Sequence, residues 1–137
     1  MIIKLRRVRK IWVLILALLP ISIMAQQLEC CKTVTAVETY LAGNWKKKDR
    51  DLNKIYQFEF KEAGGAFRIF KIDEGGALAI IKNSETVLRI LKTEKGYRLE
   101  HDRGGLKTYD GVQYLDTTTL ILTRRDGKAS VFYKVVE

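Results

Sequence analysis

The sequence has few of the residues from which enzymes build catalytic or metal sites. His101 is the only histidine, so one chain cannot form a histidine metal cluster, and two adjacent cysteines lack zinc-ligand spacing. A serine–histidine–acid arrangement could use only His101 with Ser84 or Ser130, and neither serine lies in a Gly-x-Ser-x-Gly turn. The paired glycines fit hairpin turns better than a phosphate-binding loop. We therefore predict no enzymatic activity, no metal and no cofactor.

Proline, linkers and long helical patterns are also scarce. From residue 44 onward the chain contains no proline, no low-complexity segment and no linker. Only one short segment, before residue 43, has helical spacing, so parallel strands joined by crossover helices are not expected. The region after it is predicted to be one domain.

The N-terminus has the anatomy of a secretory signal peptide. Five basic residues lie within residues 1–10, Ile11–Leu19 is apolar, Pro20 interrupts it, and Ala25 is a suitable cleavage position. An uncleaved anchor is disfavoured because a membrane span needs about 18 or more apolar residues. We predict a signal peptide over 1–25, an N-terminal segment over 26–42, and an exported protein, periplasmic or secreted, with no stable membrane span after cleavage.

Export changes the charge that matters. The formal charge is +9, but five of the 25 Lys and Arg residues lie in the signal peptide, so 20 basic against 16 acidic residues leave +4. A charge of that size aids solubility and does not indicate nucleic-acid binding.

Cys30 and Cys31 are neighbours in sequence, about 3.8 Å apart at Cα for a trans peptide, below the usual disulfide range of about 4.4 to 6.8 Å. A bond between them is expected to be strained and to close no useful loop. Lipidation at Cys30 or Cys31 is disfavoured because Glu29 directly precedes the pair. Free thiols and an intermolecular bridge remain as alternatives, and the sequence does not define an oligomeric state.

The segment from Thr33 to Ala42 is predicted to be a helix. Its apolar residues recur at spacings of three and four, Thr35 and Glu38 fit a capping box, and Gly43 stands where a helix would end. Such a helix could lie across one end of a barrel and close it.

After residue 43, short β-like runs alternate with turn signals about 8 to 12 residues apart. Tyr56, Phe58 and Phe60 share one face of their run, and Tyr97, Leu99 and His101 share one face of another. We predict an all-β fold, an antiparallel up-and-down β-barrel of 8–10 strands, because closure removes exposed sheet edges. The run 106–115 is either one strand bulged at Asp110-Gly111 or two short strands. The run 77–81, apolar on both faces, is expected to be covered on both faces or to pack against the N-terminal helix.

Three features together resemble the lipocalin superfamily, and more closely its small signal-bearing bacterial members. They are Gly43-Asn44-Trp45 after a short helix, the meander itself, and the final hairpin from Val112 to Val136. The resemblance covers roughly residues 40–137 and implies a lipocalin-like barrel domain over 43–137 with Gly43 and Trp45 at its closed end. It also implies an arginine, Arg124 or Arg125, packed over the Trp45 ring. The domain lacks the length and C-terminal helix of animal lipocalins, which weighs against a roomy chamber.

The function that this fold suggests is binding of a small hydrophobic or amphipathic ligand inside the barrel. The candidate lining residues are Tyr56, Phe58, Phe60, Tyr97, Leu99 and Tyr133. A solid core is the competing interpretation, since eight strands enclose only just enough room for side chains. In that case the chain is a cell-envelope interaction or scaffold module with no internal ligand. Arg68 and Arg89 would bind a carboxylate inside or, as such arginines more often do, extend outward.

Overall fold

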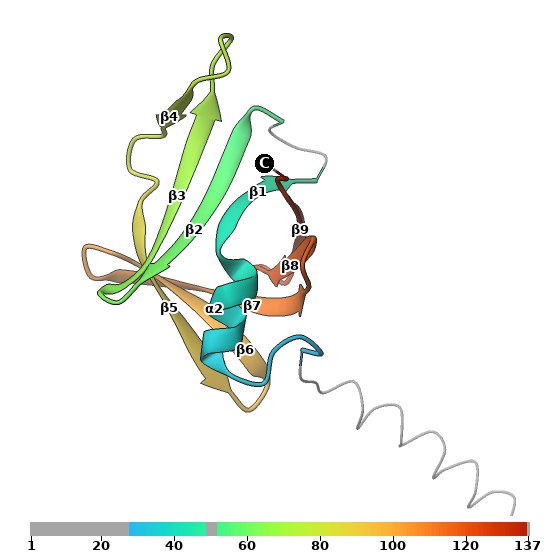
Figure 1. Cartoon of the computed structure of the whole chain (residues 1–137). Helices are drawn as coiled ribbons and strands as arrows, with labels where there is room; N and C mark the ends of the chain where they lie inside the picture. Colours follow the sequence, from blue (N-terminus) through green and yellow to red (C-terminus); the bar gives the residue numbers. More distant parts are fainter. Residues whose placement is uncertain (1–27, 49–51, 137) are drawn as a thin grey trace, which may run out of the picture.

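Short strands make up most of the described chain. The computed structural model describes residues 28–48 and 52–136, and within them one helix precedes nine strands (Figure 1). The signal peptide expected over 1–25 lies outside the described residues. The helix is α2 (Val34–Leu41), and the strands are β1 (Gly43–Lys47), β2 (Lys54–Lys61), β3 (Gly64–Ile72), β4 (Leu78–Ile80), β5 (Thr86–Thr93), β6 (Gly96–Arg103), β7 (Leu106–Leu115), β8 (Thr119–Thr123) and β9 (Ala129–Lys134).

Eight of these strands close into an antiparallel barrel, which confirms the predicted fold class. β1 pairs with β2 on one side and with β9 on the other. The ladder continues from β9 through β8, β7, β6 and β5 to β3, which pairs back to β2. β7 is one strand, as one of the two interpretations had it, although its register shift lies between Val112 and Tyr114 and not at Asp110-Gly111.

The ninth strand lies outside the ring. β3 pairs with β2 along its whole length, but on its other side it pairs first with β5 and then with β4. At the fork, Ile69 O accepts from Ile81 N at 2.8 Å, and the Ser84 hydroxyl accepts from Ile69 N at 3.2 Å in place of a ladder carbonyl and also donates to Ile69 O at 3.2 Å. β2, β3 and β4 therefore project beyond the ring as a flap (Figure 1). The expectation of a covered run over 77–81 is wrong, because Leu78 and Ile80 on β4 are about half exposed, at 51% and 50%.

Helix α2 and Trp45 close one end of the barrel. Thr33 caps the helix by accepting from Ala36 N at 3.1 Å, so the cap lies two residues before the predicted Thr35. Trp45 is fully buried, and its Nε1 donates to the carbonyl of Leu41, the last helical residue, at 2.8 Å. Gly43 joins helix to strand with φ +127°, a backbone conformation that favours glycine.

The cation over the Trp45 ring is Lys134, not the arginine that the lipocalin resemblance implies. Lys134 Nζ lies 5.1 Å from the ring centroid and donates to Tyr40 O at 3.0 Å. The register of β1 against β9 places Trp45 directly opposite Lys134, whereas Arg124 lies beyond β8. Desolvation lowers the pKa of Lys134 from its usual value.

Behind this closure the barrel has a packed core. Val37 and Leu41 of α2 meet Trp45 and inward residues of the strands, among them Leu99 and Leu120, which are fully buried. Each such aliphatic side chain stabilises the fold by about 1.5–3 kcal/mol relative to an exposed position. The end of the barrel away from α2 is less tightly packed and contains a cavity.

Candidate functional site

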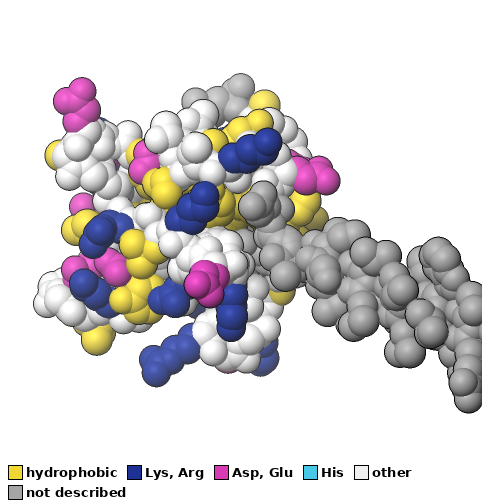
Figure 2. All heavy atoms as spheres, turned by 90° about the horizontal axis from the view of Figure 1, so that it is seen from below, with side chains coloured by type: hydrophobic (Ala, Val, Ile, Leu, Met, Phe, Trp, Pro, Cys, Tyr) yellow, Lys and Arg dark blue, Asp and Glu magenta, His cyan; other side chains and the backbone are white. Residues whose placement is uncertain are grey.

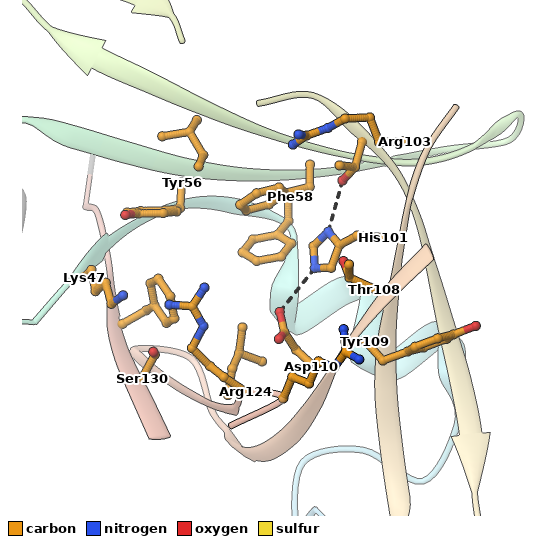
Figure 3. A pocket seen from close by; sticks show the side chains of 16 residues that line it. Lys47, Tyr56, Phe58, His101, Arg103, Thr108, Tyr109, Asp110, Arg124 and Ser130 are labelled. Carbon is orange, nitrogen blue, oxygen red and sulfur yellow. Dashed lines mark hydrogen bonds and ion pairs between the residues drawn. The ribbon is translucent and has the colours of Figure 1, made fainter. Parts of the chain in front are cut away.

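A cavity of about 440 Å³ occupies the end of the barrel away from α2 (Figure 3). Its volume lies within the range of about 300–1,000 Å³ that is typical of small-molecule sites. The wall is formed by apolar side chains from four strands: Tyr56, Phe58, Phe67, Ile69, Leu122 and Phe132.

The aromatic part of this wall is packed ring against ring. Tyr56 meets Phe132 edge-on with centroids 5.2 Å apart, and Phe58 meets Phe67 at 5.1 Å. Such contacts contribute about 0.5–1.5 kcal/mol beyond burial and hold the rings in place. A ligand would therefore meet a preformed apolar surface.

A buried histidine forms the polar part of the cavity. His101 is 9% exposed, with Thr86 Oγ1 3.0 Å from its Nδ1 and Asp110 Oδ2 3.4 Å from its Nε2. Thr86 Oγ1 and Nδ1 are within hydrogen-bond distance, and the Asp110 carboxylate lies within ion-pair distance of Nε2. Phe67 lies edge-on to the imidazole, with centroids 5.0 Å apart. Both ring nitrogens thus have partners within the wall.

The barrel's register assembles these three side chains. In β6, His101 lies opposite Leu88 of β5 and Thr108 of β7. Thr86 and Asp110 are each two residues from those partners, so they lie on the same inward face at diagonal positions. His101 is therefore a buried residue on the inward face of β6.

Four cations line the mouth of the cavity. Lys47 ends β1, Arg103 ends β6, and Arg124 and Arg125 follow β8, all at the end of the barrel away from α2. In Figure 3 the guanidinium groups of Arg103 and Arg124 extend toward the cavity from opposite sides. Asp110 is the one acidic residue among the described lining residues.

The six predicted ligand-binding residues divide three ways. Tyr56 and Phe58 line the cavity. Tyr97 and Leu99 are buried core residues, and Phe60 packs against that core. Tyr133 is 44% exposed on the outside of the barrel.

The placement of Tyr133 is a correction to the sequence prediction. β9 turns Ser130 and Phe132 inward, and a run as uniformly apolar as 131–133 does not reveal which face is buried.

Both arginines considered as internal carboxylate ligands extend outward. Arg68 pairs with Glu59 at 2.9 Å and with Glu85 at 3.5 Å. The Arg89 side chain is 66% exposed and lies 3.8 Å from Glu100. These pairs satisfy both guanidinium groups on the outer surface.

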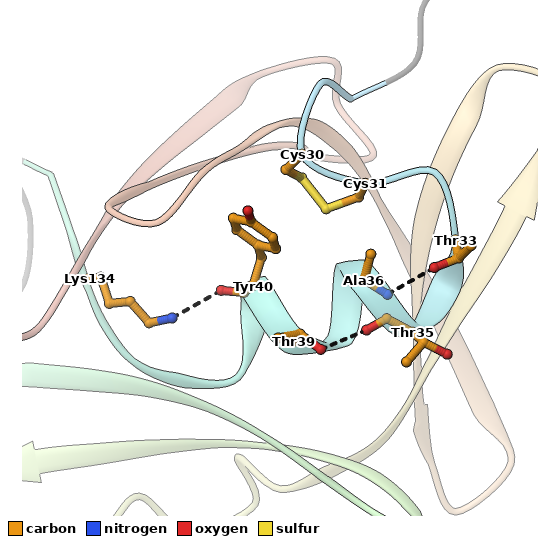
Figure 4. The surroundings of a disulfide bond; sticks show 8 residues. All are labelled: Cys30, Cys31, Thr33, Thr35, Ala36, Thr39, Tyr40 and Lys134. Carbon is orange, nitrogen blue, oxygen red and sulfur yellow. Dashed lines mark hydrogen bonds between the residues drawn. A yellow bond between two sulfur atoms is a disulfide. The ribbon is translucent and has the colours of Figure 1, made fainter.

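Cys30 and Cys31 are bonded to each other beside α2, near Tyr40 (Figure 4). Their Cα atoms are 3.7 Å apart, so the expectation against this pairing is wrong. Cys31 is 1% exposed and belongs to the core cluster around α2.

Comparison with known proteins gives no further identification: no protein-family model, no curated protein and no solved structure matches the chain. Residues 28–48 and 52–136 contain no helix that is long and apolar enough to cross a membrane. The same residues contain no group of three or more His, Cys, Asp or Glu side chains that could hold a metal ion.

Proposed function

We propose that this chain is an exported lipocalin-like protein, periplasmic or secreted, that binds a small hydrophobic or amphipathic molecule inside its barrel. The observation that carries the proposal is the cavity of about 440 Å³ behind a preformed aromatic wall. Affinity would come from burying apolar surface, and the His101 group would fix orientation. The eight-stranded ring and the buried Trp45 under a short helix support the lipocalin assignment.

The proposal involves binding without chemistry on the ligand. In a Ser-His-Asp triad the nucleophile faces Nε2 of the histidine and the acid faces Nδ1. Here the two partners are exchanged, with Asp110 on Nε2 and Thr86 on Nδ1. That arrangement suits a fixed polar wall better than an activated hydroxyl.

A tryptophan placed in the cavity tests the proposal. Thr108 lines the cavity, whereas its neighbour Lys107 on the same strand does not and lies 4.0 Å from Glu100. Thr108→Trp should abolish binding of a neutral phenylnaphthylamine probe by filling the space, and Lys107→Trp should leave it intact. Equal binding by both variants, with native circular dichroism, would place the probe outside the barrel and contradict the proposal.

Native mass spectrometry of protein purified from its host's envelope provides the second test. A co-purifying mass of lipid size that Thr108→Trp excludes supports a carrier. A bare mass, together with no probe binding by the wild type, would favour the alternative, an envelope scaffold module. The observation that favours a scaffold module is the exposure of β4. Its apolar residues Leu78 and Ile80 are half exposed, and within the described residues this strand pairs only with β3.

A further inference from the structure

The three arginines at the mouth of the cavity have no acidic partner within the part of the chain that the structure describes. The guanidinium groups of Arg103, Arg124 and Arg125 make no ion pair within residues 28–48 and 52–136, whereas Arg68 and Arg89 each have a carboxylate within 4.0 Å. The barrel thus pairs the arginines on its outer wall and leaves the arginines at its mouth available.

The positive charge continues outside the mouth. An adjoining hollow shares Lys47 and Arg124 with the cavity and adds Lys48 and Lys128. Among the described residues that line this hollow, Asp126 is the one acidic residue. The opposite end of the molecule differs, since basic and acidic side chains are interspersed in the view from below (Figure 2). A concave site with charges of one sign concentrates the field and raises the local concentration of counter-ions.

Arginine at two points of the mouth favours one class of ligand head group. A guanidinium group presents a planar fork of N–H donors that matches the oxygens of a carboxylate or a phosphate. Arg103 and Arg124 approach from opposite sides of the opening, and the aromatic wall lies below them (Figure 3). A molecule with an anionic head and an apolar body matches both surfaces at once.

We propose that the ligand is an anionic amphiphile whose oxyanion head is held between Arg103 and Arg124 and whose apolar body lies along the aromatic wall. This inference rests on the proposed function and names its ligand class. At about 30 Å³ for each water-sized group, the 440 Å³ cavity holds about 15 such groups. A chain of about ten carbons is therefore a suitable body for a probe of this cavity.

The test compares ligands that differ only at the head. Decanoate, decyl phosphate and decanol, each below its aggregation limit, displace a neutral phenylnaphthylamine probe from the wild-type mature protein. The double variant Arg103→Gln/Arg124→Gln removes both guanidinium groups from the mouth of the cavity. Lys95→Gln is the matched control, because Lys95 lies in the turn between β5 and β6 at the other end of the barrel.

The expected result is a preference for the two anions over decanol in the wild type and in Lys95→Gln. In the double variant, the ratio of the decanol to the anion dissociation constant should fall by about 10- to 100-fold, the range for losing hydrogen bonds to a charged group. Added salt should reduce the wild-type preference. Circular dichroism and retained probe binding show that each variant is folded.

Two results would overturn the inference. Equal affinity for anions and decanol, unchanged in the double variant, would leave the proposed function standing and refute the anionic head. Arginine-dependent binding to phosphatidylglycerol vesicles, with no displacement by decanoate or decyl phosphate, would assign the cations to a membrane surface instead. Failure of the wild type to bind the probe at all is the separate signature that the proposed function itself is wrong.

Discussion

Lys134 should stabilise the closed end of the barrel through Trp45, and the strength of that coupling can be measured. Lys134→Met keeps the apolar stem but removes the ammonium group, which donates to Tyr40 O at 3.0 Å and lies 5.1 Å from the Trp45 centroid. A hydrogen bond from a charged group contributes about 1.5–3 kcal/mol, and a cation over an indole contributes about 0.5–1 kcal/mol or more. Because the desolvation that lowers the pKa of Lys134 opposes both terms, we expect a net loss of about 1–3 kcal/mol.

A double-mutant cycle isolates the ring contact. The free energy of unfolding of Lys134→Met, Trp45→Leu and the double variant is measured in urea by circular dichroism, since Trp45→Leu removes the fluorophore. The double variant should be less destabilised than the sum of the single variants by about 0.5–2 kcal/mol. The same cycle with Arg124→Gln in place of Lys134→Met should be additive, because Arg124 lies at the cavity instead.

Additivity within about 0.3–0.5 kcal/mol in the Lys134 cycle would refute the proposed coupling. Coupling between Arg124 and Trp45 would mean that Arg124 packs over the Trp45 ring, as the lipocalin resemblance implies. The two cycles therefore separate what the register of β1 and β9 places over Trp45 from what the family pattern leads one to expect.

Three further substitutions test individual features of the fold. Gly43→Ala should cost about 1–3 kcal/mol in urea unfolding, because φ is +127° and the new Cβ would lie 3.1 Å from Lys134 Cε, a flexible group that can move; an unchanged midpoint would mean that the backbone adjusts freely. Ser84→Ala should cost about 1–3 kcal/mol by leaving Ile69 N without its acceptor, whereas Ile69 O keeps Ile81 N as a donor. A loss below about 0.5 kcal/mol would mean that water replaces the hydroxyl. The Tyr114 hydroxyl and two backbone N–H groups lower the pKa of Asp116 from 3.8 to about 2. The Asp116 carboxylate therefore contributes its full stability above the unfolded-state pKa, and that contribution is lost as pH falls through about 2. The difference in stability between wild type and Asp116→Asn should shrink over that pH range, and a constant difference would contradict the lowered pKa.

The features that depend on local pattern could be predicted from the sequence. Turn signals and alternation within each run identify the strands, because the side-chain period of two is visible in single segments. Helical spacing and a following glycine placed the helix before Gly43, with an error only in the capping threonine. Closure followed from the expectation that a meandering sheet best protects its edges by pairing the first strand with the last.

The features that depend on register could not. Trp45 and Lys134 are far apart in sequence, and only the pairing of β1 with β9 brings them together. Thr86, His101 and Asp110 come together only because β6 pairs with β5 on one side and with β7 on the other. One usable signal was present, since the alternation that grouped His101 with Tyr97 and Leu99 already indicated an inward histidine.

The question of a solid core or a cavity has a different answer at each end of the barrel. The average size of the inward side chains cannot answer that question, because large and small inward side chains lie at opposite ends of the barrel. Near α2 the interior is filled by Trp45, Leu99 and other large side chains. At the other end, inward positions carry small polar residues, Thr108 and Ser130 among them, and the aromatic rings opposite do not fill the space they leave. The packed half supplies the stability that lets the open half stay hollow, so substitutions that enlarge Thr108 or Ser130 should abolish ligand binding before they unfold the protein.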